Sequence, residues 1–174
     1  MAAIPFQIRA VPAVLVTLIF AALSVLQGYE LSSLITLQIL LILHPLYFWS
    51  VFRPSLFPAW MAFLIGFAID IRVGSLLGLN AFLLVFISLL IGRQQRYLRS
   101  QPFATQWAGF MLVCIGAELI RWFIMSVATM TLFPVVSQLV SGLCNAALYP
   151  ITVLVLGPAL KLVSGRSNFE KLQD

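Results

Sequence analysis

Six long apolar stretches separated by short breaks dominate the pattern of the chain. They cover residues 10–27, 31–51, 56–71, 74–91, 105–129 and 134–160. About 20 mainly apolar residues cross a bilayer as an α-helix, so each stretch predicts a transmembrane span, although the third is short. The breaks are brief, so consecutive helices are expected to be antiparallel neighbours. The pattern predicts a single-domain, all-α polytopic membrane protein with six transmembrane helices and a polar tail over residues 161–174.

The composition strengthens this prediction. Of the 174 residues, 62% are hydrophobic and 9% are charged, whereas a soluble domain averages about 45–50% apolar and about 25% charged residues. Only Arg9 is basic before the first apolar stretch, and no small-residue cleavage site follows it, so we interpret this stretch as a retained helix. Cys114, Cys144 and a single histidine lie too far apart to suggest a metal site.

The basic residues predict the orientation. Most of them fall at the N-terminus, in the second and fourth connections and in the tail: Arg9, Arg53, Arg93, Arg96, Arg99, Lys161, Arg166 and Lys171. With six spans these segments share one side, and the positive-inside rule then predicts that both termini are cytoplasmic. We interpret the fourth connection, "GRQQRYLRSQP", as a loop that sets the topology. Contact with anionic lipid or with a cytoplasmic partner is the alternative.

Several polar residues fall within the apolar stretches at similar predicted depth, in the outer half of the membrane. They are Asp70, Arg72, Asn80, Glu118 and Arg121. Charges in hydrocarbon are costly and are expected to face the bundle and pair. Glu118 and Arg121 share a helix face at i, i+3, and the expected partners of Asp70 are Arg72 and Arg121. Two hypotheses follow: a neutral cluster that locks the third, fourth and fifth helices together, or a substrate, ion or proton site.

Small residues recur at helical spacing in three places. Gly66 lies on one face of the third span with Ala62 and Asp70, Gly74 and Gly78 form a G-x-x-x-G at the start of the fourth span, and Gly142 opens a stripe in the sixth. Small residues let helices approach closely in lipid. These positions predict close packing within the bundle, with a docking groove for a partner's transmembrane helix as the alternative.

Prolines and aromatic residues add further predictions. Pro45 and Pro150 lie inside the second and sixth spans and predict helix bends. Tyr47, Trp49 and Trp60 flank the second connection and are predicted to be interface anchors.

The segment "GFAIDIRVGSLLGLNAF", preceded by "HPLYFWSVFRPSLFPAW", resembles the rod shape-determining protein MreD family of bacteria. The residues that carry the resemblance are Gly66, Asp70, Gly74, Leu77, Gly78, Asn80 and Ala81, with Glu118, Trp122 and Pro150 further along. The similar region covers about residues 31–162. The chain departs from the family pattern in its very short first outward connection and in the absence of a proline where the second span begins.

This resemblance implies a multi-pass protein of the bacterial inner membrane, without enzymatic activity or a cofactor, that serves the cell-elongation machinery. The implied partners are an MreC-like bitopic protein, MreB-type cytoskeletal filaments, the peptidoglycan synthases and membrane lipids, and no nucleic acid. The implied fold is similar to the substrate-binding subunits of energy-coupling-factor transporters. The alternative function is a vitamin-type small-molecule-binding subunit of an uptake transporter. A proton-coupled transporter is less well supported, because no internal repeat is evident.

Overall fold

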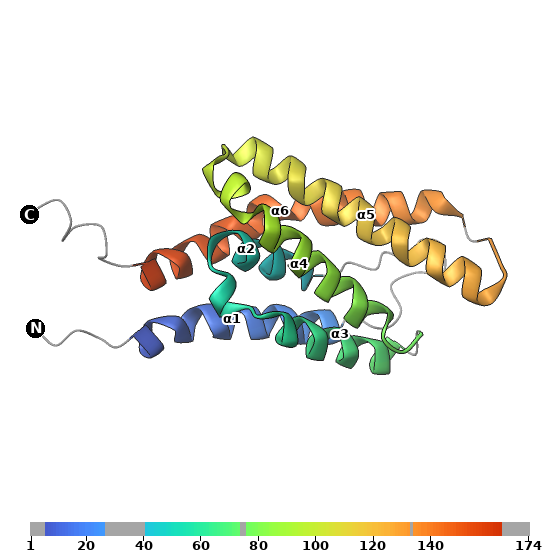
Figure 1. The fold of residues 1–174 in the computed structure, drawn as a ribbon, viewed down its shortest axis with the longest axis horizontal. Helices are drawn as coiled ribbons and strands as arrows, with labels where there is room; N and C mark the ends of the chain where they lie inside the picture. The colour runs from blue at the N-terminus through green and yellow to red at the C-terminus, as the bar shows by residue number, and fades with distance from the viewer. Residues whose placement is uncertain (1–5, 27–40, 74–75, 133, 165–174) are drawn as a thin grey trace, which may run out of the picture.

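The computed structural model describes residues 6–26, 41–73, 76–132 and 134–164, and within these ranges the chain is helical (Figure 1). Side chains are described over residues 14–24, 41–72, 76–132 and 134–160. The α-helices are α1 (Phe6–Leu26), α2 (Leu43–Phe52), α3 (Ala59–Val73), α4 (Leu79–Ser100), α5 (Phe103–Thr129) and α6 (Val135–Ser164), and a 3-10 turn, η1 (Pro54–Leu56), precedes α3. The predicted all-α fold with six helices is confirmed over these ranges.

Two of the described helices are long and apolar enough to cross a membrane by themselves. They cover Phe103–Thr129 and Val135–Leu160, and Val14–Ser24 forms a shorter apolar helix. The six-span topology stays a prediction, and residues 31–40 of the predicted second span lie outside the described residues.

The short helix α2 is the centre of the bundle. Its residues from Leu43 to Val51 are all buried, on every face of the helix, and it packs against α4 and α6. A helix that is apolar all round is either a core helix or a membrane span, and the burial of every face of α2 by protein assigns it to the core. With 10 residues and a rise of about 1.5 Å per residue, α2 is about 15 Å long. It therefore acts as a core element around which longer helices pack.

The aromatic residues of α2 do not lie at the membrane interface. Tyr47 and Trp49 are each 1% exposed, whereas Trp60 is 62% exposed, so the interface prediction is wrong for the first two. Their polar atoms are satisfied inside the bundle: the Tyr47 hydroxyl donates to the Gln106 carbonyl at 2.9 Å, and Trp49 Nε1 donates to Thr17 Oγ1 at 2.7 Å. An aromatic side chain can be buried at little cost when its polar tip finds such a partner.

Two helix ends differ from the predictions. The helix around Pro45 begins at Leu43, so Pro45 lies in the first turn, where a missing N–H breaks no intrahelical bond. Pro45 therefore starts a helix and does not bend one. The segment predicted as the fourth loop is helical to Ser100, and Arg93, Arg96 and Arg99 lie on α4. Hydropathy falls where the helix becomes polar, but the helix continues.

Helices α3 and α4 form one closely packed pair, and α5 and α6 form another. At the first seam, a Cβ atom added to Gly66 would lie 2.5 Å from Ala81 Cα and 2.6 Å from Ala81 N. At the second seam, a Cβ on Gly142 would lie 3.3 Å from Ile115 Cα. Both glycines therefore lie where two backbones come together, as small residues commonly do between membrane helices.

Helix α6 runs through Pro150 without a break between Val135 and Ser164. A proline in a helix leaves the carbonyl four residues earlier without its usual N–H donor, and here that carbonyl belongs to Ala146. Trp107 Nε1 of α5 donates to it at 2.8 Å. The freed carbonyl thus accepts a hydrogen bond that links α5 to α6. The bend predicted at Pro150 stays a prediction.

The seam at Gly66 leads to a stability prediction. Gly66→Ala should lower the free energy of unfolding by about 1–3 kcal/mol, because the new methyl group meets the backbone of α4, which cannot move aside cheaply. Thermal unfolding in mild detergent measures this change. Gly116→Ala is the matched control, since a Cβ there has no neighbour within 4 Å. Equal stability of the two variants would contradict the close packing.

Candidate functional site

Asp70 binds the N-terminus of the neighbouring helix α4. It lies near the end of α3 and is 1% exposed. Its carboxylate accepts hydrogen bonds from the backbone N–H groups of Gly78 (3.0 Å), Asn80 (3.0 Å) and Ala81 (3.2 Å), and from Asn80 Nδ2 at 2.8 Å. The first N–H groups of a helix lack intrahelical acceptors and carry a partial positive charge. Asp70 therefore caps α4 from the adjacent helix.

This arrangement corrects the expected pairing of Asp70 with Arg72. Arg72 lies in the last turn of α3 and is exposed, whereas Asp70 faces the start of α4. The two residues are separated by two positions, and side chains at that spacing do not share a helix face. The main partners of Asp70 are backbone amides, which a sequence pattern of charges cannot reveal.

Gly78 makes the cap possible by its conformation. Its φ of 96° lies in the left-handed region, which glycine adopts without the strain that a Cβ would bring. The helix begins only at Leu79, and a Cβ on Gly78 would have no neighbour within 4 Å. The interpretation of Gly78 as a helix-packing residue is therefore wrong: it is a turn residue. Gly74 lies outside the described residues.

Glu118 and Arg121 form a buried ion pair one turn apart on α5. Arg121 Nη1 lies 3.6 Å from Glu118 Oε2, and the two residues are 8% and 0% exposed for Arg121 and Glu118, respectively. Neither Glu118 oxygen accepts a hydrogen bond from the described residues. A buried acceptor without a donor is costly. Glu118 is therefore the member of the cluster whose hydrogen-bonding capacity is least used.

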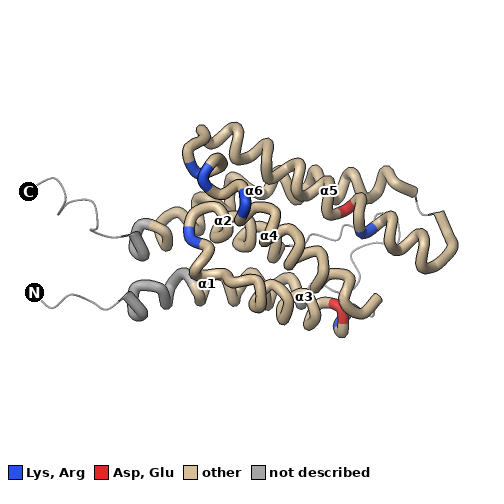
Figure 2. The backbone as a smooth tube through the Cα atoms, viewed as in Figure 1, with Lys and Arg blue, Asp and Glu red and all other residues tan. Residues whose placement is uncertain are grey.

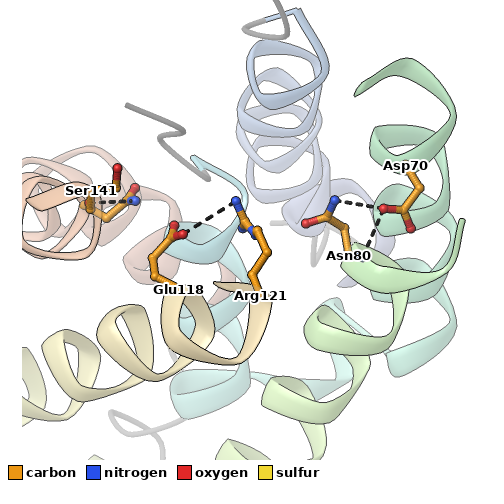
Figure 3. Close-up of polar contacts among 6 residues, drawn as sticks. Asp70, Asn80, Glu118, Arg121 and Ser141 are labelled. Atoms are coloured by element: carbon orange, nitrogen blue, oxygen red, sulfur yellow. Dashed lines mark hydrogen bonds and ion pairs between the residues drawn. The ribbon is translucent and has the colours of Figure 1, made fainter. Parts of the chain in front are cut away.

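The polar residues form one layer across four helices (Figure 3). Asp70 of α3 and Asn80 of α4 lie on one side, Arg121 and Glu118 of α5 follow, and Ser141 of α6 lies beyond them. Arg121 interacts electrostatically with the carboxylates of both Glu118 and Asp70. We refer to these five residues as the polar layer. It contains two carboxylates and one guanidinium, so the charge of Arg121 is shared between α3 and α5.

Ser141 and Asn145 of α6, which belong to this region, were not predicted from the sequence. Asn145 is fully buried on α6: its Nδ2 donates to the Ser141 carbonyl at 3.1 Å, and its own carbonyl accepts from His44 Nε2 at 3.1 Å. The histidine thus joins α2 to α6. The signal was an asparagine in the middle of the longest apolar stretch, because polar residues at that depth face the protein interior.

The chemistry available to the polar layer is recognition or stabilisation. The described residues contain no group of three His, Cys, Asp or Glu side chains that could hold a metal ion. Asp70 is engaged by α4, and Glu118 is paired with Arg121. Glu118 is the position at which a ligand or a partner group could be recognised, so the two hypotheses for the cluster can be separated by substitution there.

The described residues form an all-helical bundle with buried charges, and two of its helices are long and apolar enough to cross a membrane. A family model for the rod shape-determining protein MreD matches residues 6–157, and the chain belongs to that family. Membership carries a role in rod shape determination. No curated protein and no solved structure gives a significant match.

The cap on α4 yields a testable prediction. Asp70→Ala should lower the free energy of unfolding by at least about 1–3 kcal/mol, because buried N–H donors lose their acceptor. Asp70→Asn should be intermediate, since its amide retains one acceptor oxygen. Unfolding in detergent gives both values. Arg72→Ala, two residues away and exposed, should be as stable as the wild type. If it lowered the free energy of unfolding as much as Asp70→Ala, Arg72 would be the partner of Asp70 after all.

The ion pair on α5 yields a further testable prediction. Arg121→Met alone should cost about 3–5 kcal/mol, because it leaves the buried Glu118 carboxylate uncompensated, while the double variant Glu118→Leu/Arg121→Met should recover much of that loss. Complementation of cell shape then separates the two hypotheses. A stable double variant that restores rod shape supports a locking role, and a stable double variant that fails to do so supports a recognition role.

Proposed function

We propose that this protein is a non-enzymatic, multi-pass scaffold of the bacterial inner membrane that binds an MreC-like bitopic protein. Through that partner it helps direct peptidoglycan synthesis by the cell-elongation machinery. The match to the MreD family over residues 6–157 carries this proposal. The peptidoglycan synthases and MreB-type filaments are proposed partners, reached directly or through the bitopic protein. We also propose that the fold is of the energy-coupling-factor substrate-binding type.

The distribution of charge supports a topology with both termini in the cytoplasm. Figure 2 shows a group of Arg positions at the end of the bundle where α4 ends and α5 begins, whereas the Asp and Glu positions, together with Arg72 and Arg121, lie toward the opposite end. The basic end includes Arg53 after α2 and the arginines of the last turns of α4. An excess of basic residues marks the cytoplasmic side of a membrane protein.

The outer surface of the α3–α4 pair offers a docking face for a single-span partner. Phe63 and Phe67 stack with ring centroids 6.1 Å apart, and Phe82 and Phe86 stack at 6.0 Å. All four side chains are exposed. We refer to them as the phenylalanine face.

The two phenylalanine pairs point to the same side of the bundle. The helices run antiparallel and meet at Gly66 and Ala81. Both helices are right-handed and they run in opposite directions. The residue after Gly66, which is Phe67, and the residue after Ala81, which is Phe82, therefore lie on the same side of the seam. The residues on the other side of the seam, such as Ile69 and Leu84, are buried. The phenylalanine face therefore lies on the exposed side of the α3–α4 seam.

Aromatic side chains favour this face as a partner site. Lipid tails are as apolar as leucine, so membrane helices associate through close packing and not through hydrophobic burial. Large, rigid aromatic groups contribute much of the binding energy at protein interfaces. A transmembrane helix with small residues on one side would fit against two stacked ring pairs.

Co-purification tests both the function and the face. The wild-type protein, isolated from native membranes in mild detergent, should retain an MreC-like protein. Phe82→Ala combined with Phe86→Ala should reduce the retained amount about tenfold, and depletion of the protein should cause loss of rod shape. A tenfold loss corresponds to about 1.4 kcal/mol, which is within the range of one interface aromatic residue.

Leu112→Ala combined with Leu154→Ala is the control, because both leucines are exposed on α5 and α6, away from the phenylalanine face. Loss of the partner in the control alone would move the docking site to the α5–α6 surface. Retention of a vitamin-sized molecule in place of any MreC-like protein, with dependence on Glu118, would favour the small-molecule alternative.

A further inference from the structure

A groove lies between the start of α3 and the last part of α4, at the end of the bundle opposite the polar layer. Its volume is about 370 Å³. Phe57, Pro58 and Ala59 form one wall, and Leu89 and Gly92 form the other. Ser88 and Arg93 add polar groups to a lining that is otherwise apolar. The groove therefore combines a surface for hydrocarbon with a cationic group.

The charge around this groove is uniformly positive. Arg93, Arg96 and Arg99 are exposed on the last turns of α4, and Arg53 lies directly before Pro54, which also lines the groove. The acidic residues whose side chains the structure describes are Asp70 and Glu118, and both belong to the polar layer near the other end. No carboxylate in the described part of the chain neutralises this cluster.

We propose that the groove binds an anionic phospholipid, with the phosphate at Arg93 and an acyl chain along the apolar walls. A guanidinium group matches the geometry of phosphate oxygens. Basic pockets between membrane helices on the cytoplasmic side are suited to acidic lipid headgroups. An acidic peptide would satisfy the arginines but would leave the exposed Leu89 and the partly exposed Pro58 without an apolar partner.

Gly92 supports this assignment because the absence of a side chain leaves space in the groove. It lies within α4, where glycine is less favourable than alanine by roughly 0.5–1 kcal/mol. A Cβ at this position would have no neighbour within 4 Å, so neither backbone packing nor a turn requires glycine here. Its effect is to keep the groove wall open beside Arg93. This inference does not depend on the proposed partner or on the function of the polar layer.

Lipid competition on the full-length protein tests the proposal. The purified protein is incubated in mild detergent with equal amounts of phosphatidylglycerol and phosphatidylcholine of identical acyl chains, and bound lipid is counted by native mass spectrometry. The wild type should prefer phosphatidylglycerol. Arg93→Gln should reduce that preference about fivefold, which is the expected effect of one basic residue near an anionic lipid.

Gly92→Phe should abolish binding by filling the groove while preserving the helical circular dichroism spectrum. Gly116→Phe is the control for bulk, because a Cβ at Gly116 also has no neighbour within 4 Å. Arg72→Gln is the control for charge, since Arg72 is exposed at the far end of α3. Both controls should keep the wild-type preference.

Three results would overturn the proposal. Equal binding of the two lipids would show that charge is not recognised, and an unchanged preference in Arg93→Gln would place the lipid elsewhere. Displacement of phosphatidylglycerol by millimolar inorganic phosphate would show a bare anion site without a role for the acyl chain. Arg93→Gln keeps the test decisive even if Gly92→Phe does not fold.

Discussion

The capping of α4 by Asp70 is the interaction on which the end of the bundle around the α3–α4 connection depends. Each backbone amide at the start of a helix needs an acceptor, and in an apolar bundle water is scarce. Asp70 supplies acceptors to several of these amides from a neighbouring helix. The same principle recurs elsewhere: Tyr47, Trp107 and His44 each donate to a carbonyl of another helix. Several pairs of helices are thus joined by a side chain that binds the backbone of its neighbour.

Close packing and capping depend on each other at the α3–α4 seam. Gly66 and Asp70 are four residues apart and share one face of α3. The contact of Gly66 with the backbone of Ala81 brings α4 near enough for the carboxylate to reach its first amides. A wider seam would separate the carboxylate from those amides. The glycine therefore contributes to polar recognition although it carries no polar side chain.

The apolar stretches allowed the helices to be predicted, because hydropathy and helix length follow the same physical limits. The buried layer containing Asp70, Glu118 and Arg121 was also predictable, since charges within apolar spans face the protein. The position of α2 in the core of the bundle could not be predicted. Lipid-facing and protein-buried helices have the same hydropathy, so Tyr47 and Trp49 could not be assigned to the core. Hydrogen bonds from backbone amides, such as those that Asp70 accepts, cannot be predicted from a pattern of side chains. Hydropathy shows where a helix becomes polar, but it does not show where the helix ends.

The cap has a consequence for how the protein enters the membrane. Under the proposed multi-pass topology, α3 alone would carry the carboxylate of Asp70 into hydrocarbon without the α4 amides that donate to it, at a cost of several kcal/mol. That cost disappears only when the first turn of α4 has formed beside it. Synthesis places the two helices within a few residues of each other, joined through Gly78. On that proposed topology, α3 and α4 would pass into the lipid together, as one hairpin, because the Asp70 carboxylate meets its donors only when both helices are present.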